Sequence, residues 1–236
     1  MRIICFFLFF LTAIPSLAQV EEEPKVEKDS IPAFTDPKYR EDQFYASISY
    51  NLVQTKPSGF SLNSLSLGMT VGFLRDMPVN AARTYSIAAG LGYSYNNIKD
   101  NLIVTENNGE VFYEVNPDID YSKNRLVLHY LELPIELRWR NSDATSHKFW
   151  RIYTGFKVSY LMQDRSQFES DGSKIKVTDN KDLNEFVYGA YISAGWNTWN
   201  FYAYYGITPI YKDAKLNTGG DIKLNSLNLG LMFYIL

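Results

Sequence analysis

The feature that most constrains this chain is residues 84–95, where large and small side chains alternate without a break. Alternation with period two is typical of a β-strand. One parity holds the large apolar residues, and the other holds only small ones: Thr84, Ser86, Ala88, Gly90, Gly92 and Ser94. A strand face in water would carry Lys, Glu or Gln. Small residues suit a closed and crowded interior, so the pattern predicts a barrel whose large side chains face lipid.

Seven further segments alternate in the same way, and together they predict the architecture. They are residues 43–54, 61–73, 125–139, 149–162, 185–196, 199–211 and 222–236. Eight is the smallest even number of strands that closes a bacterial outer-membrane barrel, and closure leaves no strand edge unpaired in lipid. We therefore predict an all-β fold, an eight-stranded antiparallel up-and-down transmembrane β-barrel, over residues 41–236. A soluble β-sandwich with the large residues inside is the alternative.

Residues 1–40 precede the predicted barrel. Residues 1–18 combine a basic start, a short apolar run and small residues before Ala18, which predicts a signal peptide. A membrane anchor is the alternative, but the apolar run is shorter than the roughly 20 residues that a spanning helix needs. Residues 19–40 are acidic, contain proline and show no hydrophobic period, so we expect a flexible periplasmic tether. The only cysteine, Cys5, lies in the predicted signal peptide.

The lengths of the connections predict the orientation in the membrane. With the tether in the periplasm, both termini are periplasmic, and the outer loops are residues 55–60, 96–124, 163–184 and 212–221. The periplasmic turns are residues 74–83, 140–148 and 197–198. Long outer loops and short periplasmic turns are typical of such barrels. The loop at 55–60 is shorter than this pattern requires, and the turn at 74–83 is longer.

Aromatic side chains with outward parity gather at a common height near the expected periplasmic ends of the strands. Such rings place their apolar bodies in lipid and their polar edges at the headgroups. All four tryptophans belong to this set, and a soluble sandwich does not explain that placement. The predicted aromatic girdle consists of Phe44, Phe73, Tyr85, Trp139, Trp150, Trp196, Trp199 and Phe233.

Charged side chains with inward parity predict a network of ion pairs in the lumen. Residues 125–139 supply Glu132, Glu136 and Arg138, and residues 149–162 supply Arg151 and Lys157. Pairing of these neighbouring strands can bring acids and bases together, whereas a base facing lipid near the midplane would cost about 2–4 kcal/mol. An eight-stranded lumen is about wide enough for side chains alone. We interpret the charges as a structural plug, and a proton or solute path is the alternative.

The sequence predicts no catalytic centre and no cofactor. His129 has outward parity, but its same-face neighbour Leu131 is not the serine that a lipid-hydrolysing histidine would need. With His147 placed in a turn, two separated histidines and no cysteine cannot build a usual zinc site. The net charge of −3 gives no reason to expect nucleic-acid binding. Four loop carboxylates could bind calcium weakly, although such groups are usually solvated: Asp100, Glu106, Asp118 and Asp120.

Three motifs resemble the PorT-like outer-membrane β-barrel family of Bacteroidota. They are HYLELPIELRWR at residues 129–140, FLRDMP at 73–78 and AGLGYSYN at 89–96. The Leu-Glu-Leu-Pro element is the most telling, because Pro134 cannot donate to a strand ladder and indicates a local bulge. The resemblance covers residues 38–236. It implies a link to the type IX secretion system, which moves proteins across the outer membrane, and the family also contains many uncharacterised small barrels.

We expect a non-enzymatic outer-membrane protein that contacts lipid and serves as an accessory component of protein secretion or of another envelope complex. A small solute porin, a stand-alone structural barrel and a lipid-modifying enzyme are the alternatives, and no small-molecule substrate is expected. Apolar residues also alternate within the loop at 96–124. They predict either a hairpin with a free binding edge or a simple extension of the barrel strands: Ile103, Val104, Val111, Phe112, Tyr113 and Val115.

Overall fold

The computed structural model describes residues 42–116, 119–141 and 150–235 of the chain. The predicted signal peptide at 1–18, the predicted tether at 19–40, His147 and Asp118 lie outside these residues. In the described part of the chain, no helix has the length and apolar character needed to cross a membrane.

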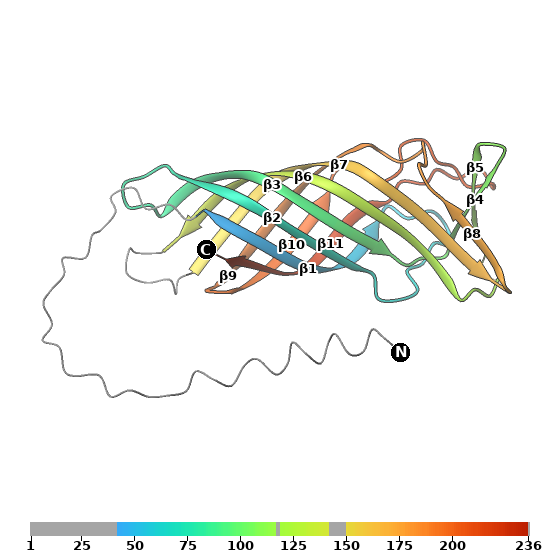
Figure 1. The fold of residues 1–236 in the computed structure, drawn as a ribbon, viewed down its shortest axis with the longest axis horizontal. Coiled ribbons are helices and arrows are strands. Elements are labelled where there is room, and N and C mark those ends of the chain that lie inside the picture. The colour runs from blue at the N-terminus through green and yellow to red at the C-terminus, as the bar shows by residue number, and fades with distance from the viewer. Residues whose placement is uncertain (1–41, 117–118, 142–149, 236) are drawn as a thin grey trace, which may run out of the picture. The chain divides into compact units, whose positions relative to one another are not determined.

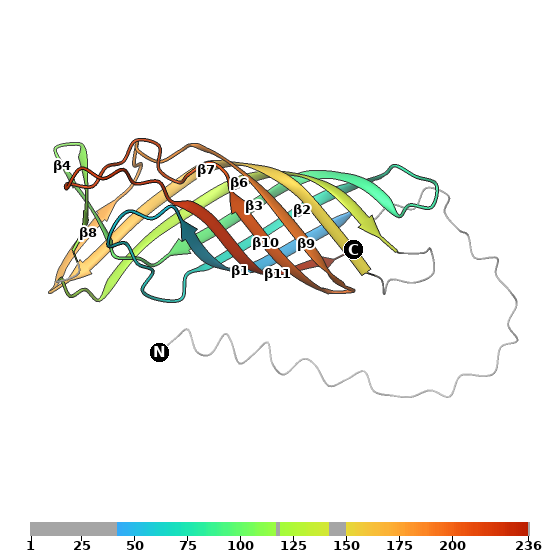
Figure 2. The same ribbon diagram turned by 180° about the vertical axis from the view of Figure 1, so that it is seen from behind.

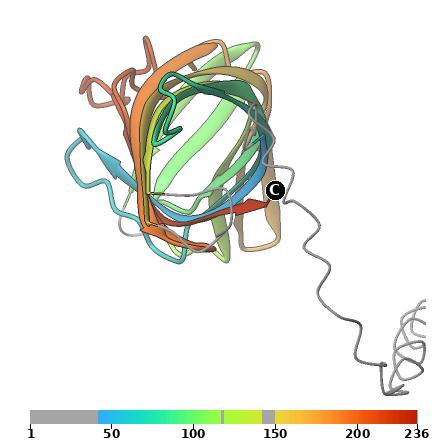
Figure 3. The same ribbon diagram turned by 90° about the vertical axis from the view of Figure 1, so that its left-hand side faces the viewer.

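Eight antiparallel strands form a closed ring (Figures 1 and 2). Figure 3 shows the strands arranged around one axis. Ring strands that follow one another in the chain pair, including β6 with β7, and the first and last, β1 and β11, pair with each other. This order confirms the predicted eight-stranded up-and-down barrel. The ring strands are β1 (Gln43–Gln54), β2 (Leu67–Pro78), β3 (Tyr85–Ile98), β6 (Lys123–Arg140), β7 (Trp150–Ser170), β9 (Phe186–Trp196), β10 (Trp199–Gly206) and β11 (Asn225–Ile235).

The two ends of the barrel differ in their connections. At one end, here called the turn end, Phe44 near the start of β1 pairs with Ile235 at the end of β11, and the connections between strands are short. The other end, here called the loop end, carries the long connections and three short strands outside the ring. One of these, β8 (Ser173–Val177), lies beside the far part of β7 (Figure 1).

The predicted bounds of the second strand are wrong. The alternation predicts residues 61–73, but β2 spans Leu67–Pro78, so the loop before it covers residues 55–66 and the turn after it covers residues 79–84. The expected short loop at 55–60 and long turn at 74–83 therefore both disappear. The physical reason is that Asp76, which falls within the predicted turn, points inward and is fully buried among its hydrogen-bond partners. β10 is also shorter than predicted and ends at Gly206.

A β-bulge explains why β7 is longer than predicted. Leu131 on β6 pairs with Tyr160 on β7, whereas His129 pairs with Gln163, so Met162 is an extra residue on β7. A bulge of this kind reverses which parity of its strand faces outward. Even-numbered residues of β7 face outward before the bulge, and odd-numbered residues face outward after it. The period-two pattern consequently breaks at residue 162, although the strand continues to Ser170.

Large apolar side chains cover the outside of the ring. Leu133 is 54 % exposed, Phe156 is 66 % exposed and Phe201 is 78 % exposed, while the inward side chains of Tyr153 and Ser193 are fully buried. Exposed residues of this kind occur on all eight ring strands. Monomeric proteins in water rarely expose so many large apolar side chains, so this outer face indicates an apolar environment.

Inner-face glycines make room for inward-facing tyrosines. Tyr45 on β1 lies opposite Gly72 on β2, and Gly72 lies opposite Gly92 on β3. A Cβ atom at Gly72 would lie 2.5 Å from the ring of Tyr45, and one at Gly92 would meet the Tyr45 hydroxyl even more closely. Glycine at both positions therefore lets a large ring lie across the small inner face that the alternation predicts.

The loop end has its own buried core. The strands β4 (Leu102–Asn107) and β5 (Glu110–Val115) form a separate two-stranded sheet, so the favoured interpretation, a simple extension of the barrel strands, is wrong and the alternative hairpin is present. That the hairpin offers a free binding edge stays a prediction. The hairpin packs into a hydrophobic cluster, here called the loop-end cluster, to which all four loop-end connections contribute. Its members include Phe60, Val104, Tyr113, Leu183, Leu216 and Leu224.

Candidate functional site: the charged lumen

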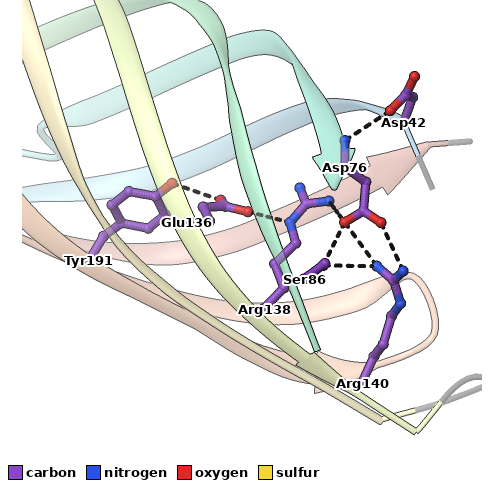
Figure 4. A network of polar contacts seen from close by, with 7 residues as sticks. All are labelled: Asp42, Asp76, Ser86, Glu136, Arg138, Arg140 and Tyr191. Carbon is purple, nitrogen blue, oxygen red and sulfur yellow. Dashed lines mark hydrogen bonds and ion pairs between the residues drawn. The ribbon is translucent and has the colours of Figure 1, made fainter. Parts of the chain in front are cut away.

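A network of charges centred on Asp76 fills the lumen near the turn end (Figure 4). Arg138 Nη1 donates to Asp76 Oδ1 at 3.0 Å, and Arg140 Nη2 donates to Asp76 Oδ2 at 2.8 Å. The Ser86 hydroxyl donates to Oδ1 at 2.7 Å. The two arginines come from β6, whereas Asp76 and Ser86 come from β2 and β3. Both charge signs are buried here, and each charge has partners of the kind that burial requires.

The same network continues across the lumen to β9. Arg138 Nε donates to Glu136 Oε2 at 2.7 Å, so this guanidinium bridges two carboxylates. The Tyr191 hydroxyl donates to the other oxygen of Glu136 at 2.7 Å (Figure 4). The chain of contacts from Arg140 to Tyr191 thus joins four ring strands through buried polar groups.

A second buried ion pair lies farther toward the loop end. Lys157 Nζ donates to the two oxygens of Glu132 at 2.9 and 3.0 Å and to the Tyr202 hydroxyl at 3.2 Å. The ammonium also lies 4.2 Å from the centre of the Tyr204 ring, a position in which the ring face attracts a cation. Lys157 and Glu132 are 6 % and 3 % exposed.

Arg151 occupies a different environment from the other predicted lumen charges. Its guanidinium lies 5.4 Å from the centre of the Tyr234 ring and 5.8 Å from that of the Tyr153 ring. In the strand register, Arg151 is opposite Arg140. The structure thus brings Glu136 and Arg138 into one network and Glu132 and Lys157 into another, and it places Arg151 against aromatic faces.

Two charged members of these networks were not predicted from the sequence. Asp76 was assigned to the turn at 74–83 and Arg140 to the turn at 140–148, yet both are buried on the inner face of the barrel. A signal was present for each, because Arg140 shares the parity of Arg138 and Asp76 shares that of the inner-face residue Gly72. Each was assigned to a turn because residues typical of turns follow it: Pro78 and Asn80 after Asp76, and Asn141 and Ser142 after Arg140.

Tyrosines complete the filling of the lumen. Two small cavities flank the Glu132–Lys157 pair, with volumes of about 20 and 10 Å³. A cavity of roughly 10–15 Å³ holds about one water molecule. At this level of the barrel the remaining cross-section is occupied by large side chains that are at most 6 % exposed: Tyr45, Tyr191, Tyr202, Tyr204 and Met232.

The residues of the predicted aromatic girdle lie on the outer face, toward the turn end. The eight side chains form four pairs of neighbours on adjacent strands. Phe44 and Phe73 have ring centres 5.2 Å apart, Trp150 and Trp196 lie 5.4 Å apart, Trp199 and Phe233 also lie 5.4 Å apart, and Tyr85 is opposite Trp139. That these rings lie at the membrane–water interface stays a prediction.

The described residues hold no group of three or more side chains suited to a metal ion. His129 Nδ1 lies 2.5 Å from the Tyr93 hydroxyl, and its ring lies against Tyr95. Asp100 is 3 % exposed and accepts a hydrogen bond from the Leu102 amide at 2.9 Å, so its carboxylate is turned into the protein.

Comparison with known proteins decides the family. A family model described as "Outer membrane protein beta-barrel domain" matches residues 18–212. The chain belongs to this family. Membership places the ring of strands in the outer membrane of a Gram-negative bacterium, with lipid against the apolar outer face described above. No curated protein matches the chain in sequence.

Two solved structures match the chain at low similarity. The attachment invasion locus protein Ail of Yersinia pestis is 14 % identical, with a TM-score of 0.37 over 82 % of this chain and 97 % of that one. A triple mutant of the Rhodopseudomonas blastica porin is 8 % identical, with a TM-score of 0.20 over 84 % of this chain and 100 % of that one. Similarity at this level carries no functional argument.

Breaking one partner of the Glu132–Lys157 pair should strongly destabilise the barrel. Lys157→Met or Glu132→Gln leaves the other group buried without its opposite partner, a change that typically costs about 3–5 kcal/mol. The double variant should lose clearly less than the sum of the two single losses, because no unpaired charge remains. Urea unfolding of the four proteins in lipid vesicles measures this coupling, and additive losses would contradict it.

Asp100 should make the stability of the loop end depend on pH. Burial raises the pKa of Asp100 to about 7, from about 3.9 in an unfolded chain. The folded protein therefore favours the protonated form, and this contribution is complete below about pH 4 and is lost as the pH rises through 7. Asp100→Asn should remove that part of the decline in stability between about pH 4 and pH 7. An unchanged decline in the variant, measured by thermal unfolding, would show that other groups cause it.

Proposed function

We propose that this chain is a closed, non-enzymatic outer-membrane barrel that acts through its surfaces, as a docking component of an envelope complex, with both termini in the periplasm. The observation that carries this proposal is the filled lumen. A solute would have to displace the Glu132–Lys157 pair and the tyrosines around it, and then separate Arg138 from two carboxylates. An open aqueous channel is therefore disfavoured relative to a structural plug.

The surroundings of the membrane-facing histidine support a non-enzymatic role. A lipid-hydrolysing histidine needs a nucleophile that it can deprotonate. The Nδ1 atom of His129 instead lies at hydrogen-bonding distance from the phenol of Tyr93, and the ring packs against Tyr95. This arrangement suits a residue that lies at the edge of the lipid layer.

Protein docking is supported by the anchored hairpin of β4 and β5. The Tyr113 hydroxyl donates a hydrogen bond to Asp182 Oδ2 at 2.9 Å and accepts one from the Asn180 side-chain amide at 2.8 Å. These two bonds hold β5 in place. The tip of the hairpin, residues 106–110, remains exposed, and Phe112 beside it is 39 % exposed. An open groove of about 580 Å³ lies between this tip and residues 178–182. A fixed, exposed tip beside a groove is suited to binding a protein partner.

An accessory role in type IX secretion is the more specific proposal, and it rests on the PorT-like motifs. Two of these motifs contain the lumen network, because Asp76 lies in FLRDMP and Glu132, Glu136 and Arg138 lie in HYLELPIELRWR. The motifs thus support a shared barrel interior, and the secretion role depends on identifying the partner.

Planar-bilayer recordings test the closed lumen. The purified protein should give no stable channels, because buried ion pairs and rings fill the cross-section near Lys157. A porin reconstituted in the same way is the positive control. Stable unitary conductance from the wild-type protein would reject the plug and favour the solute-porin alternative.

Deletion of Thr105–Glu110 tests the docking tip. Heat-modifiable mobility on gels should show that the variant still forms a barrel, while affinity purification should recover less of any partner because the tip is gone. Deletion of residues 218–220, an exposed turn in the loop between β10 and β11, is the matched control. Unchanged partner recovery would reject the docking tip, and recovery of export components with the wild type would support the secretion role.

A further inference from the structure

The three-stranded sheet that projects beyond the bulge carries a patch of basic side chains on one face. In successive rows across β6, β7 and β8, Arg125, Gln167 and Lys176 lie opposite one another, and so do Lys123, Glu169 and Lys174. Arg165 lies two residues before Gln167 on the same face of β7. We call this set of five bases the basic patch: Lys123, Arg125, Arg165, Lys174 and Lys176.

The basic patch faces outward rather than into the loop end. Arg125 and Lys123 have the parity of His129, whose ring contacts the exposed Tyr93 on the outer face. The opposite face of the same sheet is buried, with Leu126 and Val177 in the loop-end cluster. The bulge is what turns the odd-numbered residues of β7, including Arg165, to the outside.

The positive charge of this face is only partly compensated. Glu169 is the carboxylate of the paired rows, with Lys174 at 2.8 Å and Lys123 at 3.5 Å. The side chains of these two lysines are 63 % and 40 % exposed. Arg125 donates from Nε and Nη2 to the neutral amide oxygen of Gln167. Arg165 is half-buried, and its Nε atom is enclosed by the protein without a hydrogen-bond partner among the described residues. Lys174 and Lys176 are exposed, so their ammonium groups are accessible to an anion.

The height of the patch matches the headgroup layer rather than the hydrocarbon. The outward rings of Tyr160 and Phe186 pack 5.1 Å apart near the bulge, where the apolar outer surface ends. A strand rises about 3.3 Å per residue and is tilted by about 35–45° in such barrels. Arg125 and Lys123 thus lie about 10 and 15 Å beyond His129 along the barrel axis. Both distances fall outside the hydrocarbon but within reach of lipid headgroups.

We propose that the basic patch binds the phosphate groups of phosphorylated glycolipid in the leaflet that surrounds the loop end. Guanidinium forks bind phosphate oxygens in pairs, and exposed lysines add attraction for the same anions. The lipid would form a fixed contact on the β6–β7–β8 side of the barrel and orient the loop end above the membrane. This inference rests on the proposed orientation, in which the loop end is outside the cell.

Lipid binding to the purified full-length protein tests the proposal. Thermal unfolding in a zwitterionic detergent is measured with added lipid A, with lipid A whose phosphates have been removed, and with inorganic phosphate. A ligand that binds only the folded state raises the unfolding temperature in proportion to its affinity. The variant carries Arg125→Gln, Arg165→Gln, Lys174→Gln and Lys176→Gln. Its matched control carries Lys212→Gln, Lys215→Gln and Lys223→Gln in the loop between β10 and β11.

Wild type and control should be stabilised by lipid A, and the patch variant should bind it at least about ten-fold more weakly, since each basic residue near a lipid surface contributes about 1 kcal/mol. Dephosphorylated lipid A and inorganic phosphate should give no comparable shift. The milder pair Lys174→Gln and Lys176→Gln lies at exposed positions and should give an intermediate loss. Equal shifts in all variants, or an equal shift with inorganic phosphate, would overturn the proposal.

A separate measurement distinguishes failure of the patch from failure of the orientation. A cysteine introduced at Gly172, in the turn between β7 and β8, should react with an impermeant reagent on whole cells. Lack of labelling would overturn the orientation and with it the lipid contact in the cell. Labelling with no loss of lipid A binding in the patch variant would overturn the patch alone.

Discussion

A strand that lies in hydrocarbon needs a hydrogen-bonding partner along both of its edges, because lipid offers neither donors nor acceptors. In this barrel the pairing of β6 with β7 meets that requirement by closing the ring. Closure also separates two environments, since every ring strand then has one face toward lipid and one toward a narrow lumen. Large apolar residues accordingly lie on the outer face, and small residues, tyrosines and paired charges lie on the inner face. Asp76, Arg138 and Arg140 show this most clearly, because each of these buried charges needs the opposite charges beside it.

The sequence predicts those parts of the fold in which outward-facing and inward-facing residues alternate without interruption along a strand. β1 has the bounds that its alternation predicts, and parity alone assigns Glu132 and Lys157 to the inner face, where they meet at 2.9 Å. The rule fails where a distant contact overrides the local pattern. The arginine partners of Asp76 come from a strand more than sixty residues away in sequence, so a single segment gives no sign that its charge is buried. The bulge opposite His129 reverses parity within β7, and no period-two rule continues through it.

The filled interior supports the proposal that this barrel acts through its surfaces rather than through its lumen. The lumen near Lys157 has room for about one water molecule in each flanking cavity. The loop end, by contrast, has a buried core of its own that fixes the β4–β5 hairpin and the β6–β7–β8 sheet in defined positions. The hairpin presents an exposed tip beside a groove, and the sheet presents the bases that we propose bind lipid. A rigid barrel that displays ordered surfaces to lipid and to protein is what an accessory component of an envelope complex requires.

The sidedness of the strands is the central claim, and labelling from the lipid phase tests it most directly. Single cysteines at Leu91, Leu133 and Leu229, which face outward, are compared with cysteines at Ser86, Ser193 and Asn228, which face the lumen. In reconstituted vesicles, a membrane-dissolved thiol reagent should modify the first set and spare the second. Modification of the lumen-facing set with protection of the three leucine positions would contradict the account, because the apolar face would then be the buried one.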